Sequence, residues 1–66
     1  MTLHQLLGEG ASSLEKAGDP EAELDARRLL LEAFHLDTVH FLMNRMQPLS
    51  RTRDVEAATE RYREMI

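Results

Sequence analysis

The stretch from Asp19 to Leu36 constrains the fold of this chain more than any other part of its sequence. Asp19 can cap a helix N-terminus, and Pro20 suits the first helical position because the N–H that proline lacks would be unpaired there. Apolar residues then spread over more than one face of the expected helix: Leu24, Ala26, Leu29, Leu30, Leu31, Ala33 and Phe34. A helix that is apolar around most of its circumference is normally one that other helices pack around. We therefore expect a central apolar helix at about Pro20–Leu36.

An earlier helix is expected to begin almost at the first residue. Thr2 and Gln5 have the spacing of a capping box. An apolar stripe follows at the helical period: Leu3, Leu6, Leu7, Gly10, Leu14 and Ala17. Gly10 lies on this stripe, which predicts a close approach to another helix, whereas Gly8 has no such explanation. Gly18 can adopt a positive φ and is expected to stop the helix.

Two further helices are expected after Leu36. Asp37 and Thr38 are both good caps, and they precede a short helix at about Thr38–Asn44. Pro48 restricts the residue before it and removes a donor, so the helix cannot easily continue. We expect Ser50 to cap the last helix. Its apolar stripe is Val55, Ala58, Thr59, Tyr62, Met65 and Ile66, with arginines and glutamates opposite.

No segment alternates in the manner of a strand, so the sequence predicts an all-α bundle of four or five helices in one domain, residues 1–66. A core of this size rarely supplies more than about 3–5 kcal/mol. The chain has no cysteine, which excludes disulfides and thiolate metal sites. The last helix reaches the end of the sequence without a stop signal, which favours a fragment of a longer protein.

The charge of the chain is uneven. Residues 1–26 carry six acidic residues against Lys16 alone, whereas residues 27–66 carry six acidic residues against seven arginines, and the net charge is −4. An acidic front half argues against direct nucleic-acid binding as the main role. We also expect no membrane span and no signal peptide, because no apolar run is long enough and no basic region precedes one. These features favour a cytoplasmic domain.

Few residues form a pattern with catalytic or metal-binding chemistry. Glu32 and His35 have the Glu-x-x-His spacing of di-iron bundles, but such a centre needs two of these pairs and two further glutamates. A pair on the helix surface is therefore the preferred interpretation. Nothing in the spacing of His4, His35 and His40 brings them together. We expect no metal site.

Catalytic and phosphate-binding patterns are also missing. Ser12 and Ser13 have no base at a recognisable spacing, which a nucleophile would need. Gly8-Glu9-Gly10 lies inside a helical pattern rather than after a strand, so it does not suit a phosphate-binding loop. Glu21, Glu23 and Asp25 place negative charge in the first turns of the expected helix, where the helix dipole favours it. Among them we single out Asp25, for which capping or pairing with an arginine is the preferred role.

Two groups of residues could form a binding surface. Met43 and Met46 could make an adaptable one, while Phe41 and Leu42 beside them are expected to fill the core. The arginines at 27, 28, 45, 51 and 53 could form a basic patch, although a charge-balanced, solvated face is the preferred interpretation.

The order of these segments is similar to that of a known family. It comprises a Thr-Leu-x-x-Leu-Leu-x-x-Gly start, a Leu-Asp-Ala-x-x-Leu-Leu-Leu segment at Leu24–Leu31, Phe-His-Leu-Asp, then Phe41-Leu42-Met43 and Pro48-Leu49-Ser50 before a charged helix. The chain resembles the N-terminal domain of the HemK-type protein-glutamine methyltransferases, which modify peptide chain release factors. Family members often continue into paired arginines and a Gly-Glu-Pro linker, whereas this sequence has Arg61-Tyr62-Arg63-Glu64 near its end.

The resemblance implies a helical domain that precedes a Rossmann-like catalytic domain and helps to engage the release factor. The whole enzyme would transfer a methyl group from S-adenosylmethionine to the glutamine of a Gly-Gly-Gln motif. Its Gly-rich cofactor loop and Asn-Pro-Pro-Tyr motif have no counterpart here, so no catalytic or cofactor-binding residue is assigned. For contact with the partner we favour Arg27, Arg28, His35 and Arg45.

A free-standing helical interaction module with a different protein partner is the main alternative. An acyl-carrier domain would need an Asp-Ser-Leu attachment site, which Ser12, Ser13 and Ser50 do not provide. A nucleic-acid-binding helix-turn-helix is disfavoured by the acidic front half.

Overall fold

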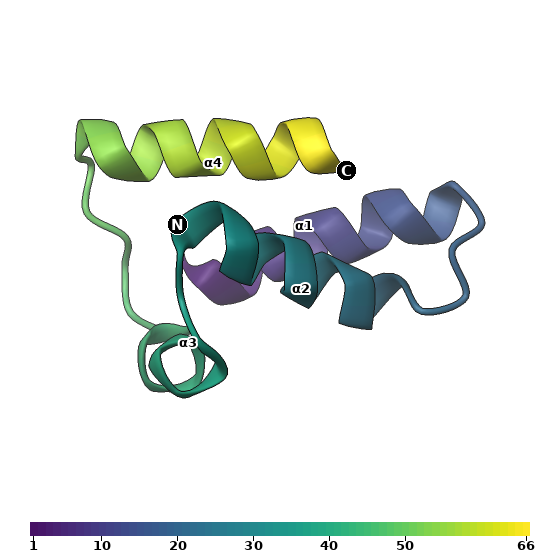
Figure 1. The fold of residues 1–66 in the computed structure, drawn as a ribbon, viewed down its shortest axis with the longest axis horizontal. Helices are drawn as coiled ribbons and strands as arrows, with labels where there is room; N and C mark the ends of the chain where they lie inside the picture. Colours follow the sequence, from purple (N-terminus) through teal and green to yellow (C-terminus); the bar gives the residue numbers. More distant parts are fainter.

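Four helices make up the protein, as seen in a computed structural model that describes all of residues 1–66. They are α1 (Leu3–Lys16), α2 (Ala22–Phe34), α3 (Thr38–Asn44) and α4 (Arg53–Met65), with no strand. Helices α1 and α2 form an antiparallel pair, and α4 packs on α2 (Figure 1). The short α3 is seen end-on at one end of this arrangement. The all-α bundle predicted from the sequence is thus confirmed, with α2 in contact with helices on two sides. No helix is both long and apolar enough to cross a bilayer.

Helix α1 begins and ends as the sequence predicts. Its capping box is complete: the Gln5 N–H donates to Thr2 Oγ1 at 3.1 Å, and the Thr2 N–H donates to Gln5 Oε1 at 2.9 Å. At the other end Gly18 has φ 92°, a conformation that glycine adopts without steric cost. The Asp19 N–H reaches the Leu14 carbonyl at 3.0 Å and the Gly18 N–H reaches Glu15 at 3.0 Å. These two bonds form a Schellman motif, which satisfies carbonyls that the helix end leaves free.

The expected start of α2 was wrong by two residues. Asp19 does not cap the helix; instead its Oδ1 accepts a hydrogen bond from the Glu21 N–H at 2.9 Å. A carboxylate that bonds the backbone two residues ahead stabilises a turn, and this turn includes Pro20. The first helical residue is Ala22, and the N-cap, Glu21, makes no side-chain capping bond.

Helix α2 also ends two residues earlier than expected, at Phe34. His35 follows with φ 54° and ψ 43°, and it is the only residue other than glycine with a positive φ. The Leu36 N–H donates to the Leu31 carbonyl at 3.0 Å, and the His35 N–H donates to the backbone carbonyl of Glu32 at 3.3 Å. The helix therefore closes with a second Schellman motif, in which histidine occupies the position that usually holds glycine.

The bounds of α3 are those predicted from the sequence, but the N-cap of α4 is a different residue from the one predicted. Asp37 Oδ1 accepts the His40 N–H at 2.8 Å and starts α3. Helix α4 is capped by Thr52, whose Oγ1 accepts the Val55 N–H at 3.2 Å, and not by Ser50. The linker is instead bonded to the start of the chain, where Thr2 pairs with Pro48 and the Leu49 N–H donates to the Met1 carbonyl at 2.8 Å. Because these bonds hold the linker outside a helix, capping is left to the next suitable side chain.

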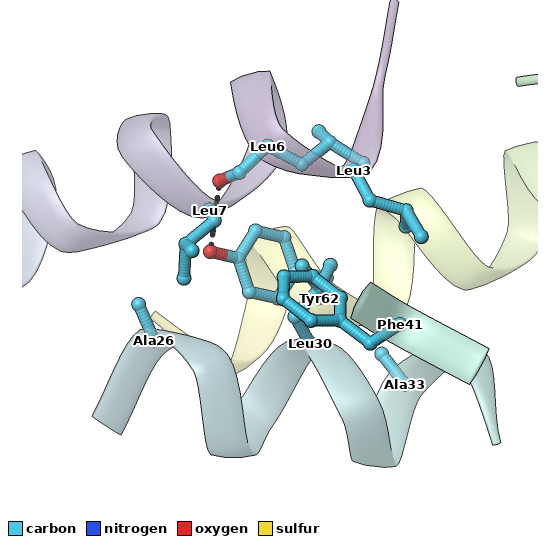
Figure 2. Packing of buried hydrophobic residues seen from close by; sticks show 8 residues of the cluster. All are labelled: Leu3, Leu6, Leu7, Ala26, Leu30, Ala33, Phe41 and Tyr62. Atoms are coloured by element: carbon cyan, nitrogen blue, oxygen red, sulfur yellow. Dashed lines mark hydrogen bonds between the residues drawn. The ribbon is translucent and has the colours of Figure 1, made fainter. Parts of the chain in front are cut away.

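The core is one cluster at the centre of the three longer helices. Figure 2 shows its members: Leu3, Leu6 and Leu7 of α1, Ala26, Leu30 and Ala33 of α2, Phe41 of α3 and Tyr62 of α4. Ala17, Leu24 and Met65 were expected to face inward but are exposed. For α2 the reason is geometric: the buried positions 26, 30 and 33 form one face, and Leu24 lies outside it.

Helix α4 is fastened to the α1–α2 pair by polar side chains. The Tyr62 hydroxyl donates to the Leu6 carbonyl at 2.9 Å (Figure 2). Arg61 Nη2 donates to the Ala33 carbonyl at 2.9 Å, which is one of the carbonyls left free at the end of α2. Arg63 Nε lies 3.2 Å from Glu9 Oε1 in an exposed ion pair with α1. No buried side-chain nitrogen or oxygen lacks a hydrogen-bond partner.

Candidate interaction site

Three helices enclose a hollow of about 320 Å³, which we name the α1–α2–α3 hollow. Its accessible rim is formed by His4, Glu23, Leu24, Arg27, Leu42 and Arg45. Its floor is formed by the core residues Leu7 and Phe41. A depression that combines apolar with polar or charged side chains in equal number suits contact with another molecule.

Local helix geometry explains why leucines lie open at this hollow. Phe41 points into the core and is 2% exposed, whereas Leu42, the next residue, is turned away by roughly 100° along the helix and is 50% exposed. Core filling by Leu42, expected from the sequence, was therefore wrong. Leu24 is 44% exposed because it lies off the buried face of α2. The two leucines leave an apolar surface that is not used in the fold.

The position of Arg45 is set by the backbone. Its carbonyl accepts the His4 N–H at 3.0 Å, which joins the end of α3 to the first turn of α1. Phe41 anchors the same helix in the core. The wall that α3 contributes to the hollow is thus held by a hydrogen bond at one end and by a buried ring in its middle.

The four residues favoured for partner contact do not form a single group. Arg27, half-buried on α2, and Arg45, exposed after α3, share the α1–α2–α3 hollow. Arg28 is exposed and lines none of the hollows. His35 lies in a different depression, between α2 and α4, beside Asp54 and Arg61.

Sequence reasoning assigned no binding role to four residues of the rim: His4, Glu23, Leu24 and Leu42. Their position depends on how α1 and α3 meet α2, which periodicity within one helix does not reveal. The one available signal was an excess of apolar residues in the short α3, including Val39 and Met43. Such an excess cannot all be buried by a helix of 7 residues.

Asp25, singled out from the sequence, lies beside another carboxylate. A hydrogen bond between the two carboxyl groups raises the pKa of Asp25 and lowers the pKa of Asp19. A hydrogen bond from the Glu21 N–H lowers the pKa of Asp19 further. Arg28 opposes the effect on Asp25. The expected pairing with an arginine is therefore a minor influence compared with the neighbouring carboxylate. Hydrogen bonds from the His40 N–H and imidazole lower the pKa of Asp37, which acts as the cap of α3.

The remaining polar groups are dispersed. Glu32 and His35 are both exposed at the end of α2, and Ser12 and Ser13 are exposed on α1. Gly8, Glu9 and Gly10 all lie within α1, so they form no loop. No three His, Cys, Asp or Glu side chains lie close enough to hold a metal ion.

Comparison with known families agrees with this description. A sequence model described as the PrmC N-terminal domain matches residues 5–66, which is nearly the whole chain. The chain belongs to the PrmC N-terminal domain family. This membership confirms the resemblance inferred from the Leu24–Leu31 segment and the punctuation around Pro48. No curated protein and no solved structure matches the chain. Residues 5–66 therefore correspond to the domain that this family model describes.

Proposed function

We propose that this PrmC N-terminal domain docks peptide chain release factors for a protein-glutamine methyltransferase. The enzyme would transfer a methyl group from S-adenosylmethionine to the glutamine nitrogen of the Gly-Gly-Gln motif. Membership of the PrmC family supports the reaction class. The cofactor and the catalytic groups would belong to a separate catalytic domain, and the expected setting is the cytoplasm, where translation takes place.

The observation that carries the proposal is the character of the α1–α2–α3 hollow. Two arginines and two exposed leucines meet there on a domain whose net charge is −4. Arginine is enriched at protein–protein interfaces because its planar guanidinium binds carboxylates in a bidentate manner and its stem packs on apolar groups. The preformed walls of the hollow keep the cost of ordering low on binding.

The role of such docking is positional. A domain that holds the partner converts the encounter between glutamine and catalytic pocket into an effectively intramolecular step. The free energy of docking thus raises the local concentration of the Gly-Gly-Gln loop at the pocket, without a catalytic group on this domain. Contacts with the catalytic domain would set the direction in which the release factor is presented.

Titration of the 66-residue chain into a purified release factor tests the proposal. We expect saturable binding by isothermal titration calorimetry, with a Kd on the order of micromolar, as is common for transient interfaces of small area. A translation factor of similar charge without a Gly-Gly-Gln domain serves as the control and should not bind. Absence of binding to the release factor, with the chain shown to be folded by circular dichroism, would contradict the proposal and favour a module with a different partner.

A further inference from the structure

We infer that the α1–α2–α3 hollow takes a protein segment in which an apolar side chain is flanked by carboxylates, with the apolar group seated between Leu24 and Leu42 and the carboxylates bound by Arg27 and Arg45. The inference rests on the proposed function, because it assigns this segment to the release factor. It also defines the chemistry of the contact, which family membership does not.

The charges that line the four hollows of the domain single out this one. Here Arg27 and Arg45 face one acidic residue, Glu23. In the hollow beside Met1, two arginine side chains are matched by two glutamates: Arg51 and Arg63, Glu56 and Glu60. The α2–α4 hollow balances Arg61 against Asp54, and the hollow at Pro48 contains no charged residue. An excess of cationic side chains thus occurs at one hollow only, on a domain that is acidic as a whole.

The cations of this hollow are also free to bind a partner. Arg61 is bonded to the Ala33 carbonyl, and Arg63 is paired with Glu9, so both serve the fold. Neither Arg27 nor Arg45 makes a side-chain hydrogen bond, and the two ion pairs of the structure involve other residues. A carboxylate brought between them would gain charge-assisted hydrogen bonds without breaking any within the domain.

The apolar part of the segment follows from what α3 exposes. Outside the hollow itself, α3 and the turn after it expose further apolar side chains: Val39, Met43 and Met46, which are 63%, 70% and 65% exposed. Covering clustered apolar groups is favourable in proportion to the area removed from water. Methionine side chains adapt their shape to what covers them. An apolar side chain that enters the hollow beside Phe41 would therefore extend the existing core outward.

The overall charge disfavours nucleic acid as the occupant. A phosphate backbone repels a domain of net charge −4, and two arginines could neutralise only a few phosphates. A short acidic-apolar segment needs only the local cations and also uses the leucines. Its binding depends weakly on salt, because charges that become partly buried are screened less than exposed ones. Binding to RNA would instead fall steeply with salt.

Matched charge reversals test the inference, with the release factor itself as the probe. We expect Arg27→Glu and Arg45→Glu each to raise the Kd about tenfold or more, and Leu42→Ala to raise it by a similar factor. Arg53→Glu is the control, since it makes the same change at an exposed position at the start of α4 that lines none of the hollows. It should change the Kd less than about twofold. Arg27 is half-buried, so Arg27→Gln and circular dichroism of each variant guard against misfolding.

Peptides tiled across the release factor then identify the segment. The peptides that bind should contain an apolar residue next to Asp or Glu, and replacing these carboxylates by amides should abolish binding. In 15N and methyl NMR spectra they should shift the signals of Leu24, Leu42 and Arg45. A basic binding peptide, or signals that shift elsewhere, would overturn the inference, as would stronger binding of a poly-uridine RNA. If the release factor binds and the hollow variants bind equally well, the inference fails while the proposed function stands; if the wild-type chain does not bind, the proposed function itself fails.

Discussion

The Tyr62 phenol of α4 lies directly against the backbone of Gly10 in α1. A Cβ atom on Gly10 would overlap the phenol oxygen and would lie 2.6 Å from Tyr62 Cζ and 2.8 Å from Ile66 Cδ1. The hydroxyl uses this close approach to reach the Leu6 carbonyl, 56 residues away in the sequence. The contact therefore joins the two ends of the chain through a position that only glycine can occupy.

Replacing Gly10 by alanine is expected to destabilise the protein by about 3 kcal/mol, because the added methyl group displaces the ring and breaks its hydrogen bond. Gly8 is a matched control on the same helix. Nothing lies within 4 Å of the position its Cβ would take, so Gly8→Ala should stabilise the chain by about 1 kcal/mol through helix propensity. Urea unfolding followed by circular dichroism measures both. Equal effects of the two substitutions would contradict the close approach.

Alkaline pH should destabilise the protein through Tyr62. Burial, assisted by the Glu9 carboxylate, raises the pKa of Tyr62 to about 12 from its ordinary value of 10.0. Below pH 10 the phenol keeps its proton in the folded and in the unfolded chain. Between pH 10 and 12 only the unfolded chain loses it, so the free energy of unfolding should fall by about 1.4 kcal/mol per pH unit.

Tyr62→Phe separates this titration from the other effects of high pH. The variant should be about 1 kcal/mol less stable at neutral pH, because the Leu6 carbonyl loses a buried hydrogen bond. Its stability should then lack the decline between pH 10 and 12. A decline as steep as in the wild-type chain would show that another group is responsible.

The start of α4 can be tested with two alanine substitutions. Thr52→Ala removes the oxygen that accepts the Val55 N–H and should cost about 1 kcal/mol. Ser50→Ala removes a hydroxyl that makes no such bond and should change stability by less than about 0.5 kcal/mol. Thermal unfolding measures the difference. A larger loss for Ser50 would restore the cap expected from the sequence.

His35 stores backbone strain that glycine would relieve. With φ 54°, histidine occupies a left-handed conformation, so His35→Gly should stabilise the protein by about 0.5 kcal/mol, the gain being limited by the added entropy of the unfolded chain. Arg28→Gly, in the interior of α2, should instead destabilise it by about 1 kcal/mol. If His35→Gly gains stability but weakens binding to a release factor, the imidazole contributes to recognition.

Much of the fold could be predicted from the sequence because it depends on local signals. The capping box at Thr2, the stop at Gly18 and the bounds of α3 follow from backbone preferences of a few neighbouring residues. The close approach at Gly10 was predicted because a glycine on an apolar stripe has few other uses. The error at Asp19 arose because its carboxylate bonds the Glu21 N–H within the turn before the helix. At Ser50 it arose because the linker is bonded to the start of the chain, which leaves the cap of α4 to Thr52.

Only part of the candidate site could be predicted from the sequence. Arg27 and Arg45 could be named because free arginines are common at interfaces, but their meeting across 18 positions of sequence depends on how α3 folds back onto α1. The exposure of Leu24 and Leu42 could not be foreseen either, since an apolar residue off the buried face has the same local pattern as one on it.

By itself, the sequence determined that this protein is a small all-α domain with a central helix, and its segment order identified the family. Periodicity and capping specify helices because each involves atoms only a few residues apart. The tertiary structure decided which faces are buried, which arginines serve the fold and which remain free at the α1–α2–α3 hollow. These depend on packing between helices, where the ring of Tyr62 and the absence of a side chain at Gly10 set how closely α4 approaches α1.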